Sequence, residues 1–261
     1  MLSDQERRDC AEALAKADAE RSVIIQPSRT FPAMDIQDAY AIQMQWAKLR
    51  QASGARMIGH KIGLTSRAMQ MASKISEPDY GHLLDDMLYG DGATIPVSRF
   101  INPRIEVEIA FALGEPLKGP GVQAHDVLRA TEFVTPAMEI IDYRTEVPRE
   151  ITDTIADNAA AAGIVMGGRV VRPLDIDLRW VGATLSKNGG IEESGISAAV
   201  LGHPAAGVAW LCNKLAALDT GLTAGEIILS GSFTRPVSVS EGDVIHADFG
   251  PLGALAVRFS E

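Results

Sequence analysis

The stretch PRIEVEIAF, residues 103–111, alternates apolar residues with Glu106 and Glu108 before it becomes wholly apolar. Successive side chains of a strand point to opposite faces, so the two glutamates would share one face. At a rise of about 3.3 Å per residue, their Cβ atoms would lie about 6.5–7 Å apart. One explanation is a half-exposed antiparallel strand with solvated glutamates, since most charged side chains are solvated. The other is a hard cation, Mg²⁺, Mn²⁺ or Ca²⁺, held between the carboxylates.

A third carboxylate, Glu139, lies in the stretch PAMEIIDYR, residues 136–144, between apolar neighbours. A glutamate in an apolar strand is costly unless it is paired or binds a metal. One explanation is an ion pair with Arg104 or Arg144. The other is that Glu139 joins Glu106 and Glu108, so that two strands supply three oxygen donors to one ion and leave positions for substrate.

Length and composition limit the class of protein. The chain has 261 residues, 46% hydrophobic, with a formal net charge of −10, which fits one sizeable domain or a main domain with a small appendage. The acidic balance argues against nucleic-acid binding. No apolar run has the roughly 18 residues of a membrane helix, and the charged N-terminus lacks the apolar segment of a signal peptide. The only two cysteines form no CxxC pattern, which argues against a disulfide framework or a zinc site. We expect a soluble cytoplasmic protein.

The first 54 residues have the pattern of a small helical part. Residues 3–22 form an amphipathic pattern opened by a capping box, with Ser3 as cap and Glu6 three residues later. After a proline-containing link, residues 36–54 repeat apolar residues at helical spacing and end at Gly54. We therefore divide the chain into a helical lead-in, residues 1–54, and a main β-roll domain, residues 55–261.

The remainder of the chain is rich in short strands. A strand is predicted from Met57, a helix after Ser66, a loop region over 77–98, and a helix over 124–134. The strand with Glu139 is predicted to begin at Pro136, where proline is tolerated. Asn188-Gly189 indicates a hairpin turn. A helix with proline in its first turn follows over 203–218, and glycine-punctuated strands over 224–260 are typical of an antiparallel sandwich or roll.

The stretch GHKIGLTS, residues 59–66, places His60 and Lys61 in a strand. Lysine is seldom buried without a role or a partner, so Lys61 is either a surface lysine on an edge strand or a functional one. His60 is either a structural histidine or a substrate ligand. Adjacent strand residues face opposite ways, so at most one of the two points at a given site. Asp79, in the loop SEPDYG, is either a turn former or a functional carboxylate, whereas Asp85 and Asp86 look solvated or capping.

The segment SGSFTRP, residues 230–236, is a turn of small residues that carries Ser232 and Arg235. Such a turn would either close a hairpin or bind the carboxylate of a ligand, because arginine pairs with carboxylates in a bidentate manner.

Taken in order, GHKIGLTS, ISEPDYGHLLDDM, PRIEVEIAF, PAMEIIDYR, DTIADNAAAAG, LGHPAAGVAWLCNKLA and SGSFTRP resemble the hydratase/decarboxylase branch of the fumarylacetoacetate hydrolase superfamily. The resemblance covers nearly the whole chain, from about residue 39 to residue 259, and rests on many ordered motifs. It implies an α+β protein with a mixed β-roll or sandwich core, like the C-terminal domain of that superfamily, and a small N-terminal helical part. It also implies a ring-like homo-oligomer.

The resemblance assigns roles residue by residue. Glu106, Glu108 and Glu139 match the metal ligands of the family, usually for Mg²⁺, with Mn²⁺ possible. Lys61 and Asp79 match its active-site lysine and aspartate, and we expect Asp79 to move protons while Lys61 holds charge or relays a proton. We expect His60, Ser232 and Arg235 to bind substrate, with Arg235 on the carboxylate farthest from the metal.

The implied function is hydration of a 2-oxo-enoate in the breakdown of aromatic compounds. The expected substrate is 2-oxohept-4-ene-1,7-dioate, which would give 4-hydroxy-2-oxoheptane-1,7-dioate. Alternatives are decarboxylation of 4-oxalocrotonate, hydration of 2-hydroxypenta-2,4-dienoate, C–C bond hydrolysis as elsewhere in the superfamily, and a catalytically silent binding protein. Between IIDYR and DTIADN lies only TEVPREIT, shorter than expected for a heptenedioate hydratase, and a loop there would shape the far end of the substrate site.

Overall fold

The glutamate-bearing strands form the middle of a large sheet. In the computed structural model, which describes residues 1–261, β5 (Arg104–Leu113) and β6 (Thr131–Ile141) are long antiparallel neighbours. The sheet has eight strands in the order β2-β1-β10-β5-β6-β7-β3, with β11 paired to β5. The other strands are β1 (Met57–Gly63), β2 (Asp79–Leu84), β3 (Leu88–Gly90), β7 (Ala161–Met166), β10 (Ile227–Leu229) and β11 (Val237–Ser238).

A second sheet packs against the first. It has five strands in the order β4-β13-β12-β8-β9. Its members are β4 (Thr94–Pro96), β8 (Gly182–Lys187), β9 (Gly190–Ile196), β12 (Val244–Asp248) and β13 (Ala254–Ser260). Both sheets are mixed, since β1 runs parallel to β10, β3 to β7, and β4 to β13. The main core includes the fully buried rings of Phe111, Phe249 and Phe259. The predicted α+β fold with a mixed β-roll or sandwich core is confirmed.

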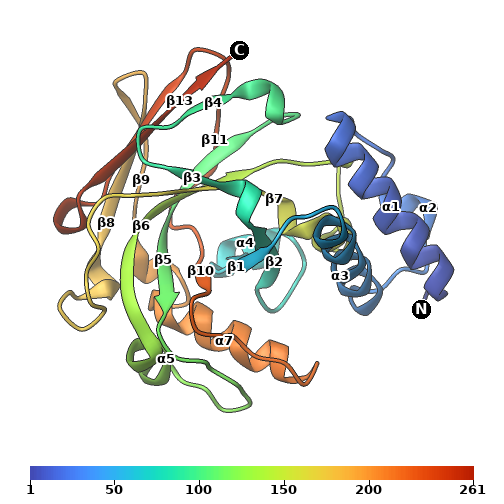
Figure 1. Ribbon diagram of the computed structural model, residues 1–261, viewed down its shortest axis with the longest axis horizontal. Coiled ribbons are helices and arrows are strands. Elements are labelled where there is room, and N and C mark those ends of the chain that lie inside the picture. The colour runs from blue at the N-terminus through green and yellow to red at the C-terminus, as the bar shows by residue number, and fades with distance from the viewer.

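Helices gather at one side and one end of the sheets. Figure 1 shows α1, α2 and α3 together on the side away from β8, β9 and β13. The seven α-helices are α1 (Asp4–Glu20), α2 (Pro27–Thr30), α3 (Ile36–Ala52), α4 (Arg67–Ala72), α5 (Ala124–Ala130), α6 (Ile151–Ala156) and α7 (Pro204–Ala216). Six short 3₁₀ turns complete the list: Asp85–Met87, Val97–Arg99, Asn158–Ala160, Leu178–Trp180, Ser197–Ala199 and Gly250–Leu252. None of the helices has both the length and the apolarity needed to cross a bilayer.

The N-terminal helices begin as their sequences predict. The Ser3–Glu6 capping box is present at α1, and α3 ends just before Gly54, whose φ is +108°. Leu14 and Trp46 are buried in a cluster that also contains Ile155 of α6 and Leu84 of β2. The helical lead-in therefore shares a core with the rest of the chain, and the division at residue 54 stays a prediction.

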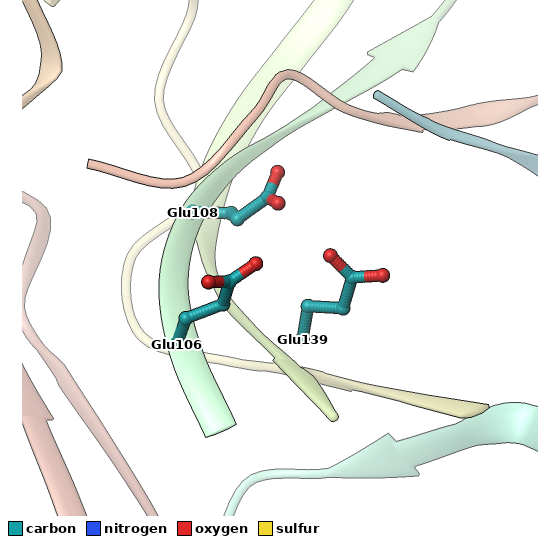
Figure 2. A group of neighbouring side chains, drawn as sticks. All are labelled: Glu106, Glu108 and Glu139. Atoms are coloured by element: carbon teal, nitrogen blue, oxygen red, sulfur yellow. The ribbon is translucent and has the colours of Figure 1, made fainter. Parts of the chain in front are cut away.

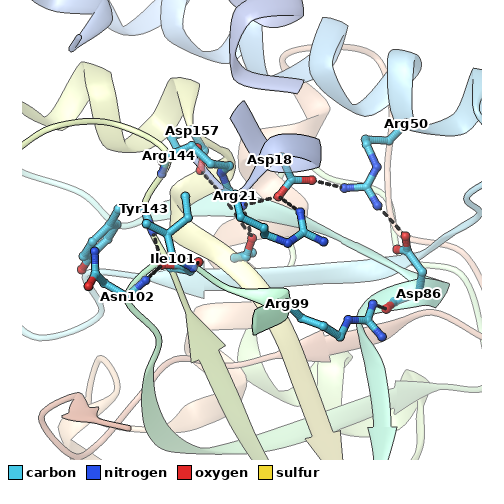
Figure 3. A network of polar contacts seen from close by, with 12 residues as sticks. Asp18, Arg21, Arg50, Asp86, Arg99, Ile101, Asn102, Tyr143, Arg144 and Asp157 are labelled. Atoms are coloured by element: carbon cyan, nitrogen blue, oxygen red, sulfur yellow. Dashed lines mark hydrogen bonds and ion pairs between the residues drawn. The ribbon is translucent and has the colours of Figure 1, made fainter. Parts of the chain in front are cut away.

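A buried arginine, Arg144, links α1 to the chain segments that follow β6 through ion pairs. The guanidinium of Arg144 pairs with Asp157, and its Nη1 lies 3.3 Å from Asp18 Oδ1 on α1. Arg50 of α3 bridges Asp18 at 2.6 Å and Asp86 at 2.5 Å. Figure 3 shows this network, in which Asp18 lies between arginines from separate segments of the chain. It holds α1 and α3 beside the segment that follows β6.

Three local predictions are wrong. Residues 77–98 were predicted as a loop region, but β2 lies within them and all six of its residues are buried. The helix predicted over 124–134 ends at Ala130, because the chain already pairs with β5 from Thr131. For the same reason β6 begins before Pro136. The proline is tolerated inside the strand because pairing with β7 extends only as far as Ala137.

The other short-range predictions are confirmed. Asn188 and Gly189, with φ of 53° and 85°, form the tight turn between β8 and β9. Both residues have positive φ, as a type I′ turn requires. Helix α7 begins at Pro204, capped by His203, whose Nδ1 accepts from the Ala205 N–H. Both cysteines are free and buried.

Candidate metal centre and active site

Glu106, Glu108 and Glu139 converge at the middle of the large sheet. Glu106 and Glu108 are on the same face of β5, and Glu139 lies opposite Glu106 on β6. One carboxylate oxygen from each lies within 4.8 Å of the other two. Figure 2 shows the carboxylates pointing toward one another from the two strands. The predicted shared face and the predicted convergence with Glu139 are both present.

Burial makes this cluster electrostatically unfavourable without added positive charge. Glu108 and Glu139 are completely buried, and Glu106 is half-buried. Burial and the charge of Glu139 raise the pKa of Glu106 to about 8. Burial, with the neighbouring glutamates, also raises the pKa of Glu108 well above its ordinary value. Like charges in a water-poor site disfavour ionisation, so three ionised carboxylates here require a cation.

The donor set fits a hard divalent ion. Oxygens bound to one Mg²⁺ or Ca²⁺ at about 2.0–2.6 Å lie no more than about 4–5 Å apart, which matches the spacing of the cluster. Glu108 Oε2 accepts from the Gly231 N–H at 2.7 Å, while its Oε1 has no hydrogen-bond partner. Glu139 Oε2 is also buried without a partner. These free oxygens are the atoms that would hold the ion.

A glycine fixes the backbone that orients Glu108. Gly231 has a φ of +120°, and a Cβ at this position would lie 2.4 Å from the Thr65 side chain. Glycine is the residue that adopts such a φ without strain. The turn before Ser232 can therefore approach β5 closely enough to donate its N–H to the carboxylate.

Lys61 is the cation that contacts Glu139. Its Nζ lies 3.2 Å from Glu139 Oε1, and the residue is 4% exposed. Burial opposes its charge, but Glu139, Asp79 and the other carboxylates together raise the pKa of Lys61 above its ordinary value. The alternative of a surface lysine is excluded. So is an ion pair between Glu139 and Arg144, because Arg144 pairs with Asp157.

Asp79 lies beside Lys61 through the pairing of β1 with β2. Its ladder partner is Gly63, where a Cβ would lie 2.2 Å from Asp79 Oδ1 and 3.3 Å from Lys61 Nζ. Gly63 thus leaves room for both side chains. Asp79 is 2% exposed, and Oδ1 has no hydrogen-bond partner. Burial raises the pKa of Asp79, although the charge of Lys61 opposes the rise.

These groups open into a cavity of about 490 Å³. Lys61, Asp79 and Glu106 line its inner end, and Ser232 and Arg235 line it as well. The Ser232 hydroxyl donates to the Thr234 carbonyl at 2.9 Å and also lies near enough to Glu106 to oppose the rise in its pKa. The Arg235 side chain is 83% exposed and pairs with Glu193. The structure thus gathers four of the five residues predicted to act on or bind the substrate, beside the three predicted metal ligands.

His60 lies elsewhere. It is the ladder partner of His82, and their ring centroids are 5.2 Å apart. Its Nδ1 lies 3.8 Å from Glu226 Oε2, and it does not line the cavity. Adjacent residues of β1 face opposite ways, so the strand that points Lys61 at the glutamates points His60 away. The substrate-binding role predicted for His60 stays a prediction, with this placement against it.

One wall of the cavity was missed from the sequence. It is formed by Ile141, Tyr143, Thr154, Ala159 and Ala160. Ala159 and Ala160 have φ of 49° and 62°, a left-handed conformation that is unusual for alanine. Backbone strain of this kind gathers at functional sites. No sequence pattern predicts a left-handed conformation for two alanines. Tyr143, in contrast, lies within PAMEIIDYR, the stretch that was predicted as a strand.

Known proteins resemble the chain throughout its length. The family model for the fumarylacetoacetate (FAA) hydrolase C-terminal region matches residues 57–260. The 2-oxo-hept-4-ene-1,7-dioate hydratase of Escherichia coli is 53% identical over 256 residues, covering 95% of this chain and 96% of that protein. The 2-hydroxyhexa-2,4-dienoate hydratase of Comamonas testosteroni is 43% identical, covering 88% of each chain.

A solved structure shares the fold almost completely. The 4-oxalocrotonate decarboxylase from Pseudomonas putida G7, complexed with magnesium and adipate, has a TM-score of 0.97 and 36% identity and covers 99% of each chain. The whole-chain identities and the family match lead to one conclusion about ancestry. The chain belongs to the fumarylacetoacetate (FAA) hydrolase C-terminal family.

Proposed function

We propose that this protein is a divalent-metal-dependent hydratase that converts 2-oxohept-4-ene-1,7-dioate and water to 4-hydroxy-2-oxoheptane-1,7-dioate. The observation that carries the proposal is that Lys61, which lies 3.2 Å from Glu139, and Asp79 line the same cavity as Glu106, a member of the three-glutamate cluster. Similarity supports the choice of substrate, because the hydratase of Escherichia coli is 53% identical to this chain, against 36% for the structurally similar decarboxylase.

Glu106, Glu108 and Glu139 would hold the ion, which we propose to be Mg²⁺, with Mn²⁺ able to replace it. Bound there, the ion supplies a Lewis acid that stabilises negative charge developing on the C2 oxygen of the substrate. Everything else in the reaction is movement of protons and placement of water. Those tasks fall to the side chains of the chain itself.

The chemistry requires two proton movements before water adds. In the 4-ene the double bond is not conjugated with the C2 carbonyl, so one proton leaves C3 and another reaches C5. The double bond then lies between C3 and C4, water adds at C4, and C3 gains a proton. Asp79 is our general base and acid for C3. Its burial raises its pKa, and a carboxylate with a pKa nearer neutrality is a better proton carrier.

Lys61 keeps positive charge at the inner end of the cavity. Its contact with Glu139 holds it beside the ion site, where it stabilises charge on the reacting oxygens or relays a proton. We place Ser232 beside the carboxylate at C1, because it lies next to Glu106. Arg235 sits at the exposed rim, where its charge would help to attract a dianion to an acidic protein.

Decarboxylation of 4-oxalocrotonate is the second candidate. The observation in its favour is the 0.97 TM-score with a decarboxylase that was solved with magnesium and adipate. Loss of CO₂ from the carbon γ to the 2-oxo group would deliver electrons to the same C2 oxygen. In the heptenedioate an additional methylene blocks that path, so water addition remains. Hydration of 2-hydroxypenta-2,4-dienoate is the third candidate. A catalytically silent binding protein has little reason to keep three converging carboxylates.

We further propose that the enzyme acts in the cytoplasm as a homo-oligomer, ring-like in arrangement, on a small 2-oxo-enoate dicarboxylate. The function is tested by treating the protein with a chelator and measuring hydration of 2-oxohept-4-ene-1,7-dioate. Activity should disappear and return with Mg²⁺ or Mn²⁺. Full activity of the metal-free protein would contradict the proposal.

A further inference from the structure

The proposed substrate has two carboxylates, and the inner end of the cavity has few positive charges for them. Four carboxylates, those of Glu106, Glu108, Glu139 and Asp79, surround a single ammonium group, that of Lys61. A divalent ion there would be occupied with the C1 end of the substrate. The second carboxylate, at C7, therefore needs a cation elsewhere along the cavity. Three arginines lie near the cavity, Arg235, Arg149 and Arg104, and Arg104 is set aside because it is exposed, with its Cζ 6.0 Å from the centre of the Tyr143 ring.

Arg235 lines the cavity but is already engaged. Its Nε and Nη2 both donate to Glu193 Oε1, at 2.9 and 2.7 Å. Its side chain is also 83% exposed. An ion pair in such a position is neutralised by its partner and screened by water. Arg235 can help to attract a dianion, but it adds little to the selectivity of the cavity for dicarboxylates over monocarboxylates.

Arg149 is different, because its charge has no partner. It lies between β6 and α6, and its Cζ is 3.2 Å from the centre of the Tyr143 ring. Its Nε and Nη1 are buried and have no hydrogen-bond partner, and it forms no ion pair. The buried Arg144 nearby, in contrast, pairs with Asp157. Buried donors without acceptors are unfavourable and call for an explanation.

The position of Arg149 connects it to the cavity. Arg149 does not itself line the cavity, but Tyr143, against which it stacks, lines it together with Ile141 and Thr154. The positive charge of Arg149 also opposes the rise in the pKa of Asp79. Its field therefore reaches the carboxylate at which we place proton transfer. The wall beside Tyr143 is mostly apolar, as suits the hydrocarbon part of a substrate.

We infer that Arg149, held against Tyr143, binds the distal carboxylate of the substrate and so makes the site selective for dicarboxylates. The inference rests on the proposed function, because it assumes that the 2-oxo-acid end binds at the glutamate cluster. Arg149 would donate charge-assisted hydrogen bonds to this carboxylate once its guanidinium shifts along the Tyr143 ring toward the cavity. Stacking on the ring would limit the orientations of the guanidinium, which reduces the entropy lost on binding.

The test uses two saturated ligands that the enzyme cannot hydrate, 2-oxoheptanedioate and 2-oxoheptanoate. They differ only in the terminal carboxylate, so the ratio of their dissociation constants isolates its contribution. With Mg²⁺-loaded wild-type protein, calorimetry should show the dicarboxylate binding about ten to a hundred times more tightly, the usual effect of charge-assisted hydrogen bonds. In Arg149→Gln this ratio should fall close to one, while the affinity for oxalate is unchanged.

Arg235→Gln is the matched control and should keep most of the ratio. Arg149→Lys keeps the charge but not the planar group, so its ratio of dissociation constants should lie between those of wild type and Arg149→Gln. This variant replaces Arg149→Gln in the test if Arg149→Gln does not fold. An undiminished ratio in a folded Arg149 variant, or a ratio near one in the wild type, would overturn the inference while leaving the proposed function standing. If wild-type protein with Mg²⁺ bound neither oxalate nor either 2-oxo acid, the proposed function would itself fail.

Discussion

Glu106 and Glu139 are direct partners across the β5–β6 ladder. Antiparallel pairing brings the Cβ atoms of opposite residues to about 4.5–5.5 Å, where two glutamates would ordinarily repel. Glu108, two residues along β5, faces the same side. The pairing register therefore builds the cluster, and a shift of one residue would turn its members to opposite faces.

Glu106→Gln should weaken metal binding while the protein remains folded. One carboxylate is replaced by a neutral group of the same shape, and the loss should at least equal the about 10–100-fold seen when outer-shell partners of metals are removed. Mn²⁺ binding followed by electron paramagnetic resonance measures it directly. Glu132→Gln, an exposed glutamate at the start of the same strand β6, is the control and should bind Mn²⁺ like wild type. Unchanged affinity in Glu106→Gln would mean that the ion, if any, binds elsewhere.

Lys61→Met and Asp79→Asn should separate catalysis from metal binding. Each should reduce turnover by about 10²–10⁴, the usual scale for lost acid–base assistance. Mn²⁺ affinity should survive in both, because neither side chain belongs to the cluster of three glutamates. Steady-state kinetics and a Mn²⁺ titration on the same preparations are sufficient. Normal turnover by either variant would make that residue structural only.

The metal-free protein should become less stable as the pH rises from about 5 to 8. Burial and the charge of Glu139 raise the pKa of Glu106 from 4.5 to about 8, so the folded state keeps protons that the unfolded state has lost. The free energy of unfolding falls with pH wherever the folded state binds more protons. The contribution of Glu106 to stability is therefore fully present below the pKa that this residue has in the unfolded chain. It is lost as the pH rises toward the pKa of about 8 that Glu106 has in the folded protein.

Thermal unfolding in chelator at pH 5, 6, 7 and 8 measures this dependence. Mg²⁺ should restore stability most strongly at pH 8, since the ion binds the ionised carboxylates. Glu106→Gln removes one titrating group and should flatten the slope in chelator. A transition temperature that rises between pH 5 and pH 8 in the metal-free protein would contradict the assigned electrostatics.

Arg144→Met should destabilise the fold by about 3–5 kcal/mol, because it leaves the buried Asp157 without its partner. The side chain of Arg144 is 2% exposed and also reaches Asp18, so α1 should loosen as well. Arg172→Met removes an exposed pair with Asp175 and should cost no more than about 1 kcal/mol. Urea denaturation of the two variants gives the comparison. Equal stabilities would show that the network in Figure 3 does not fasten the helices.

The sequence was most informative where periodicity and chemistry agreed. Alternation placed Glu106 and Glu108 on one face, and the apolar setting of Glu139 pointed to the same site. The rule that neighbours in a strand face opposite ways also allowed only one of His60 and Lys61 at the site, and the structure places Lys61 there. The order of motifs then gave the family, which the comparisons confirm.

It was least informative where burial covers both faces or where the backbone is unusual. Strand β2 lacks alternation because all of its residues are buried, and its flanking Pro and Gly resemble those of a loop. The left-handed Ala159 and Ala160 are held by their surroundings, not by any intrinsic preference. The unpaired donors of Arg149 depend on which side chains lie nearby in space, and a single sequence does not contain that information.

The most direct test of the central claim measures hydration and CO₂ release in the same tube. Purified protein with Mg²⁺ is given 2-oxohept-4-ene-1,7-dioate, and in a parallel reaction 4-oxalocrotonate. Loss of substrate absorbance follows turnover, and a gas-phase measurement follows CO₂. The heptenedioate should be consumed to 4-hydroxy-2-oxoheptane-1,7-dioate without release of CO₂. Stoichiometric CO₂ from 4-oxalocrotonate, with no turnover of the heptenedioate, would contradict it.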